Sequence, residues 1–297
     1  MAEIALNQTE RARQASGQSL RRQRRIGQGV IYLLLVILSI LFLLPLVWMF
    51  VTSLMPLAQV GKIPPEWIPN PVQWANYGKA LTFWNFSRSF WNTTLVTAMS
   101  MIGSILSCTL VAYSFARLRF PGRETLFMIL LSTMMLPYAV TMVPLYIVYS
   151  KLRWVNTFLP LIVPTFFGNP FLIFLLRQFF RTLPEEIIDA SRIDGASEIG
   201  ILLRIILPLS GPALIVVAIL SFQNAWNDFM GPLIYLNDTS LHTLALGLYQ
   251  FRGMPGQGSL FNELMAASVI MVMPMLIIFA IFQKQFVQSV TLSGLKG

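Results

Sequence analysis

The chain has 297 residues, of which 56% are hydrophobic and only 11% are charged, and its formal net charge is +9. A soluble domain of this length needs more charge to cover its surface, so the composition excludes that class and predicts an integral membrane protein. The single cysteine, Cys108, and the single histidine, His242, are too few for a zinc site or an internal disulfide, and no metal site is predicted.

Residues 1–29 form a basic tail that we expect to lie in the cytoplasm. The tail carries six arginines, at positions 11, 13, 21, 22, 24 and 25. No aromatic residue is interleaved with them, which favours anionic lipid headgroups over nucleic acid as the partner. The apolar run from Val30 to Val51 is longer than that of a signal peptide and lacks a small-residue cleavage pattern, so it is predicted to be a retained first span.

Charged residues are missing from six windows of the chain, each at least 20 residues long. The windows are 30–61, 89–116, 125–150, 154–176, 205–227 and 264–283. About 20 helical residues cross a hydrocarbon core of about 30 Å, and a charge at its centre is costly. We therefore predict an all-α integral membrane protein with six transmembrane helices, at about 30–52, 90–116, 125–148, 156–177, 205–227 and 263–283.

The distribution of basic residues predicts the orientation. With the N-terminus inside, 15 of the 21 basic residues fall on the cytoplasmic side, which favours a topology with both termini in the cytoplasm. The expected organisation is the tail 1–29, a transmembrane domain 30–283 and a cytoplasmic C-terminal tail 284–297.

Prolines interrupt most of the later spans and are expected to kink them, because proline removes a backbone donor. They are Pro137, Pro144, Pro160, Pro164, Pro170, Pro208, Pro212 and Pro274. Kinked helices are common around translocation paths. They are also common in membrane proteins that only pack, so the kinks support a path weakly.

Polar side chains gather near two outer helix ends. One group contains Asn92, Thr93 and Thr97, and the other contains Gln223, Asn224 and Asn227. Hydroxyls and amides could line a path for a neutral, hydroxyl-rich solute. Hydrogen bonding between helices is the alternative, and we favour it for any single residue.

The loop at residues 178–204 is amphipathic and is expected to face the cytoplasm. Pro184, Glu185 and Glu186 predict the start of a short helix. This helix would also contain the isoleucines at positions 187, 188 and 193. Asp194-Gly195 predicts a turn, and Ser197 with Glu198 predicts a second helix that continues into the fifth span. An ordinary loop in the headgroup region is the alternative, which five carboxylates disfavour.

The loop carries a family resemblance. Residues 189–212, DASRIDGASEIGILLRIILPLSGP, resemble the EAA loop of ABC-importer permeases, with Asp189 in place of Glu and Ser191 in place of Ala. Further matches are Ala112–Arg117, Phe120–Arg123, Met135–Pro137, Val143–Tyr146, Asn156-Thr157 with Leu159-Pro160, and Leu292–Gly297. The chain is most similar to the second, G-type permease of maltose-type sugar importers.

The resemblance implies a type I ABC-importer permease architecture in which the inner loop is a coupling helix seated on an ATPase subunit. The implied coupling residues are Glu186, Asp189, Ala190, Ser191, Asp194, Gly195, Ala196 and Ser197. The tail residues Ser293, Gly294 and Lys296 would reach between the two ATPase subunits. The implied partners are an F-type second permease, an ATPase dimer, an extracytoplasmic solute-binding protein and the lipid of a bacterial or archaeal cytoplasmic membrane.

No nucleotide-binding motif G-x-x-x-x-G-K-[ST] occurs in the sequence, so ATP and Mg²⁺ are expected in the partner ATPase, and neither a cofactor nor a catalytic residue is predicted here. A permease of the same class for glycerol phosphate or an oligosaccharide acid is one alternative, although no predicted span carries a basic residue away from its ends. A membrane-embedded enzyme or an ion-coupled transporter would need an ionisable group inside a span. The nearest carboxylates, Asp228 and Glu263, lie at the outer edges.

Overall fold

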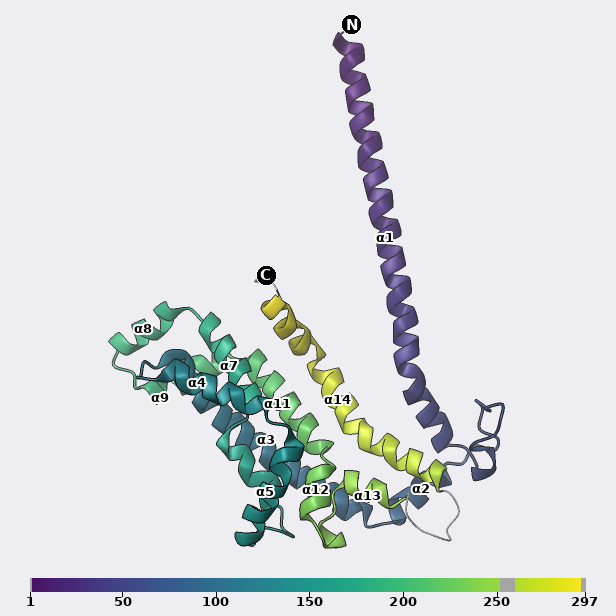
Figure 1. Ribbon diagram of the computed structural model, residues 1–297. Coiled ribbons are helices and arrows are strands. Elements are labelled where there is room, and N and C mark those ends of the chain that lie inside the picture. Colours follow the sequence, from purple (N-terminus) through teal and green to yellow (C-terminus); the bar gives the residue numbers. More distant parts are fainter. Residues whose placement is uncertain (1, 252–259, 295–297) are drawn as a thin grey trace. The chain divides into compact units, whose positions relative to one another are not determined.

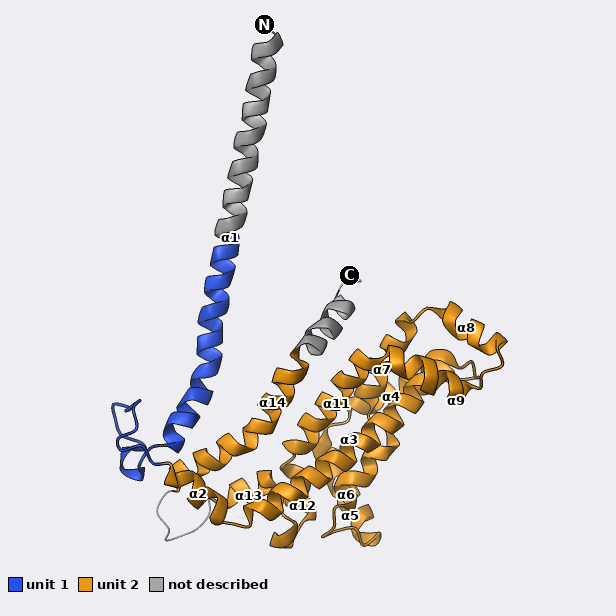
Figure 2. Cartoon of the chain, turned by 180° about the vertical axis from the view of Figure 1, so that it is seen from behind, with its two compact units in different colours: residues 1–73 blue, residues 74–297 orange. Residues whose placement is uncertain are grey.

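The computed structural model describes the backbone of residues 2–251 and 260–294 and the side chains of residues 27–251 and 260–283. Every regular element in this described part is helical, as the composition predicted (Figure 1). The chain divides into two compact units, residues 1–73 and residues 74–297 (Figure 2).

The first unit consists of the helix α1 (Ala2–Ser53), the short helix η1 (Leu57–Gln59) and an irregular segment up to Gln73. The side chain of Gln59 fastens this segment, because its Oε1 accepts a hydrogen bond from the amide of Asn70 at 2.9 Å. Trp48 and Trp67 meet edge to face, with ring centroids 4.9 Å apart. None of the most apolar window of α1 is buried within the chain, which is the surface expected of a helix that a membrane or another subunit covers.

The second unit contains all the remaining helices. In chain order these are α2 (Ala75–Thr82), α3 (Phe86–Arg117), α4 (Arg123–Ser132), η2 (Thr133–Met135), α5 (Tyr138–Lys151), α6 (Leu159–Ile162), η3 (Val163–Phe167), α7 (Pro170–Thr182), α8 (Glu185–Ile193), α9 (Glu198–Ile201), η4 (Leu202–Ile206), α10 (Leu207–Leu209), α11 (Gly211–Trp226), α12 (Met230–Tyr235), η5 (Thr239–Leu241), α13 (Leu244–Gln250) and α14 (Phe261–Gly294).

Four helical stretches of the described residues are long and apolar enough to cross a membrane. They are Gly27–Ser53, Phe86–Arg117, Leu159–Thr182 and Phe261–Gln283. Two further pairs of helices pass the same test together but are sharply bent, by 99° between Arg123–Met135 and Tyr138–Lys151, and by 84° between Glu198–Leu209 and Gly211–Trp226. The number of candidate spans is therefore four, or six if each bent pair is one span.

Proline explains where both bends occur. Leu136, directly before Pro137, has the extended backbone that a following proline imposes. The second bend lies at Ser210, between Pro208 and Pro212, where two backbone donors are missing within one turn. The expected breaks are confirmed at these positions, whereas Pro144 and Pro274 lie inside the continuous helices α5 and α14.

The core of the second unit lies around α3, against which α7 and α11 pack (Figure 2). Towards the C-terminal end of α3, its buried residues Cys108, Ala112 and Tyr113 join a single hydrophobic cluster with α4, α7, α8, α9 and α11. The middle of α3 approaches η3 closely, because a Cβ on Gly103 would lie 2.5 Å from Oγ1 of Thr165. One continuous helix therefore connects the two ends of this unit.

Candidate functional site

The loop that follows α7 forms an elbow of two short helices, as its sequence predicted. Helix α8 begins at Glu185 directly after Pro184, and helix α9 begins at Glu198. Gly195 turns the chain with a φ of +79°, a conformation that side-chain-bearing residues rarely adopt. The hydroxyl of Ser197 accepts a hydrogen bond from the amide of Gly200 at 3.2 Å and caps α9. The predicted helix start, turn and second helix are confirmed.

The elbow presents most of its polar residues to the surroundings. Of the eight coupling residues implied by the resemblance, seven are exposed: Glu186, Asp189, Ala190, Asp194, Gly195, Ala196 and Ser197. Ser191 is half-buried and donates its hydroxyl proton to the carbonyl of Ile187 at 2.7 Å. These residues are accessible to a partner protein, while their role in coupling stays a prediction.

The three isoleucines of α8 differ, which the sequence analysis did not anticipate. Ile188 is 1% exposed and packs into the core, but Ile193 is 87% exposed. Five residues along a helix correspond to a rotation of about 140°, so the spacing alone places Ile193 away from the buried face. Ile199 is also 67% exposed, so the elbow presents two apolar side chains that sequence reasoning missed.

One arginine organises the charges of the elbow. Nη1 of Arg192 lies 3.1 Å from Oδ1 of Asp189, and its Nε lies 2.9 Å from Oε1 of Glu198. The hydrogen bond with Glu198 raises the pKa of the Arg192 guanidinium above its ordinary value. No ion pair joins Glu186 or Asp194 to another residue in the described part of the chain, so these carboxylates keep their charge free for a partner.

Two side chains of α3 hold the elbow in place. The hydroxyl of Tyr113 donates to Oε2 of Glu198 at 2.5 Å. Arg117 donates to the carbonyls of Phe180 and Leu183, the latter at 2.6 Å, at the end of α7. Basic groups suit this position because a helix C-terminus carries partial negative charge. The sequence had placed Arg117 at the end of a family match and among the inner basic residues, but had indicated no contact for it.

An ion pair between a buried arginine and an exposed glutamate lies beside this attachment. Arg177 is 4% exposed, its Nη2 lies 2.9 Å from Oε2 of Glu124, and its guanidinium stacks 3.9 Å above the ring of Phe127. Its Nε also donates to the carbonyl of Phe115 at 3.2 Å. Arg177 therefore joins α7, α4 and the end of α3.

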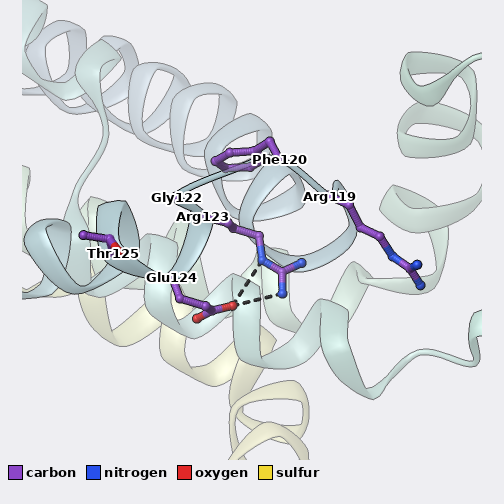
Figure 3. Close-up of a pocket in the computed structure, with 6 residues that line it drawn as sticks. All are labelled: Arg119, Phe120, Gly122, Arg123, Glu124 and Thr125. Carbon is purple, nitrogen blue, oxygen red and sulfur yellow. Dashed lines mark hydrogen bonds and ion pairs between the residues drawn. The ribbon is translucent and has the colours of Figure 1, made fainter.

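Two hollows open next to these contacts. The first, of about 470 Å³, lies at the turn between α3 and α4, where Arg123 bonds the carboxylate of Glu124 and Arg119 points away from that pair (Figure 3). The second, of about 600 Å³, is lined by Arg117, Arg119, Asp189, Arg192 and Glu198 together with Leu118 and Phe120. Among the described residues, no group of three His, Cys, Asp or Glu side chains could hold a metal ion.

Two of the polar residues assigned to a possible path bond to the backbone of another segment. Asn92 donates to the carbonyls of Ser240 at 2.9 Å and His242 at 3.1 Å. Thr93 accepts from the amide of Leu244 at 2.8 Å. These two residues make the hydrogen bonds between segments that the alternative interpretation expected.

The other four path residues are split between two helices. Thr97 is 2% exposed on α3, whereas Gln223, Asn224 and Asn227 are exposed on α11. Their contribution to a path stays a prediction. The tail residues Ser293, Gly294 and Lys296 lie outside the residues whose side chains the structure describes.

Comparison with known proteins gives consistent matches. Residues 108–292 match the family described as "Binding-protein-dependent transport system inner membrane component". The arabinooligosaccharides transport system permease protein AraQ of Halalkalibacterium halodurans is 36% identical over 74% of this chain and 77% of its own. The trehalose/maltose transport system permease protein MalG of Thermococcus litoralis is 32% identical over 88% of this chain and 94% of its own.

A solved structure shares the fold. A chain of a bacterial ABC transporter involved in the import of the acidic polysaccharide alginate superposes with a TM-score of 0.78 at 24% identity, over 89% of this chain and 97% of that one. The family match covers more than half of the sequence, and it includes the elbow and the core around α3. The chain therefore belongs to the family of inner-membrane permease components of binding-protein-dependent transport systems.

Proposed function

We propose that this chain is the permease subunit that forms half of the translocation path of an ATP-driven importer for a sugar or an oligosaccharide. The observation that carries the proposal is the exposed elbow of α8 and α9, which combines free carboxylates at Glu186 and Asp194 with the 87% exposed side chain of Ile193. The names of the relatives AraQ and MalG support the class of solute.

In this proposal the elbow docks on an ATPase subunit in the cytoplasm. Burying an isoleucine side chain completely is worth about 1.5–3 kcal/mol, so Ile193 alone is a substantial anchor. ATP and Mg²⁺ bind to the ATPase dimer, whose closure moves the elbow as a rigid body. The F-type second permease supplies the other half of the path, and an extracytoplasmic binding protein delivers the solute.

The proposed topology places six spans in the membrane with both termini in the cytoplasm. Each bent helix pair then counts as one span, broken at Pro137 and at Ser210. Irregular backbone at such depth is tolerated where it is packed against protein or lines a cavity. The excess of basic residues on one side supports the orientation.

A second candidate is a permease of the same class for an anionic solute, such as glycerol phosphate or an oligosaccharide acid. The alginate importer, which shares this fold, favours it because its solute is an acidic polysaccharide. Away from their ends the predicted spans contain no Lys or Arg, which favours a neutral solute. An ion-coupled secondary transporter is a weaker candidate, because no predicted span contains an Asp, Glu or His away from its ends.

Transport by the assembled complex tests the proposal. The chain is co-expressed with its partner permease, ATPase and binding protein, and the complex is reconstituted in lipid vesicles. We expect ATP-dependent uptake of radiolabelled neutral oligosaccharides, and no uptake when the ATPase subunit is left out. Preference for glycerol phosphate or alginate fragments would select the second candidate. Uptake by the chain alone, driven by a proton or sodium gradient, would overturn the proposal.

A further inference from the structure

The elbow is attached to α3 by more than apolar packing. Ile188, Ile201 and Ile206 already bury it against the core cluster. Five polar side chains, Tyr113, Arg117, Asp189, Arg192 and Glu198, add a second attachment, which we call the polar brace.

The polar brace is continuous from α3 to both arms of the elbow. Tyr113, itself 3% exposed, donates to one oxygen of Glu198, and Arg192 donates to the other at 2.9 Å. Arg192 then reaches Asp189 on α8 at 3.1 Å. A linked set of charge-assisted hydrogen bonds is stiffer than separate contacts, because each bond orients the next.

Arg117 attaches the same end of α3 to the start of the elbow. Its guanidinium donates to the carbonyl of Phe180 and, at 2.6 Å, to that of Leu183. Leu183 precedes Pro184 and the first residue of α8. A displacement of α8 therefore pulls on α3 through the backbone as well as through Glu198.

At its other end, α3 is attached to a different segment. Asn92 and Thr93 hold the carbonyls of Ser240 and His242 and the amide of Leu244. Between these attachments α3 is a single unbroken helix of 32 residues, in contrast to the bent pair that ends in α11. A continuous helix fixed at both ends can carry a displacement from one end of the unit to the other.

We infer that Tyr113 and Arg117 are positioning residues that join the elbow to α3, so that a movement of the elbow displaces the helix carrying Asn92 and Thr93. This inference rests on the proposed function, since it takes the partner ATPase as the source of the movement. Tyr113 and Arg117 touch neither ATP nor the solute; they act through Glu198 and the end of α7.

The test follows the conformational response to ATP in the complete transporter. A single cysteine at the exposed position Asn224, in a Cys108→Ala background, reports on α11 through its labelling rate with a membrane-impermeant maleimide. The variants are Tyr113→Phe, Glu198→Gln and their combination, and Arg117→Lys is added because it keeps the charge but cannot span two carbonyls. Tyr32→Phe, at a position 68% exposed on α1, is the matched control.

We expect ATP–Mg²⁺ to change the labelling rate in the parent and the control. In Tyr113→Phe and Arg117→Lys, ATP hydrolysis continues, but the ATP-dependent change in labelling falls about three- to tenfold. Combining Tyr113→Phe with Glu198→Gln lowers the labelling response no further than Glu198→Gln alone, because the bond of the Tyr113 hydroxyl is made to Glu198.

Three results would overturn the inference or its basis. Full ATP-dependent labelling in Tyr113→Phe and Arg117→Lys contradicts the positioning role. Loss of ATP hydrolysis in proportion to labelling shows a merely structural role. If labelling of the parent transporter does not respond to ATP at all, the proposed function fails, and this inference fails with it.

Discussion

The two ends of α3 use polar side chains in opposite ways. At one end, Asn92 and Thr93 form hydrogen bonds with backbone atoms of the segment 240–244. At the elbow, part of the polar surface is paired through Arg192, while Glu186 and Asp194 keep exposed carboxylates. A polar residue in an apolar helix therefore indicates a binding role only when it is not already the hydrogen-bond partner of a neighbouring backbone group.

The largest expected effect comes from breaking the turn of the elbow. Gly195 has a φ of +79°, and proline is fixed near −65°, so Gly195→Pro cannot keep the native turn. We expect ATP-driven uptake to be abolished while the protein still inserts into the membrane. Uptake assays and membrane fractionation measure the two outcomes, and Gly61→Pro, at a glycine outside the elbow with a φ of +82°, serves as the matched control.

Reversing the charge of Asp194, which has no ion pair in the elbow, is expected to reduce ATP-driven uptake almost as strongly. Asp194→Lys removes an exposed carboxylate that has no ion pair among the described residues, so stability of the isolated chain should not change. ATP-driven uptake should fall at least tenfold because the partner surface then meets the wrong charge, a mismatch that costs several kcal/mol at an interface. Normal uptake by this variant would count against the elbow as the docking surface.

A substitution at the opposite end of α3 should lower the stability of the protein rather than weaken its docking on the ATPase. Asn92→Ala leaves the carbonyls of Ser240 and His242 without their donor, which costs about 1–3 kcal/mol for buried groups. A lower melting temperature of the detergent-solubilised protein is the expected result. Asn224→Ala, at an exposed position, is the matched control and should leave the melting temperature unchanged.

The smallest expected effect concerns the cap of α9. Ser197→Ala removes the hydroxyl that accepts from Gly200 and should destabilise the elbow by about 1 kcal/mol. Hydrogen exchange of residues 198–202 should become faster, and uptake should fall by less than it does in Asp194→Lys. Unchanged exchange at these amides would show that α9 does not depend on its cap.

Much of the fold can be predicted from the sequence, because helices, breaks and turns depend on residues that are close together in the chain. Charge-free windows predict the apolar helices, Pro137 and Pro208 predict the broken ones, and Asp194-Gly195 predicts the turn of the elbow. The sequence cannot predict the partner of Asn92, since Ser240 lies 148 residues away. The bonds of Tyr113 and Arg117 depend in the same way on how α3, α7 and α9 pack.

The exposed side chain of Ile193 offers the most direct test of the claim that the elbow docks on the ATPase. A photo-crosslinking amino acid is placed at Ile193 in the complete transporter, with Ile63, 94% exposed in the first unit, as the matched position. We predict a covalent adduct between this chain and the ATPase subunit from position 193 and none from position 63. An actively ATP-hydrolysing transporter in which position 193 labels only lipid would contradict the account.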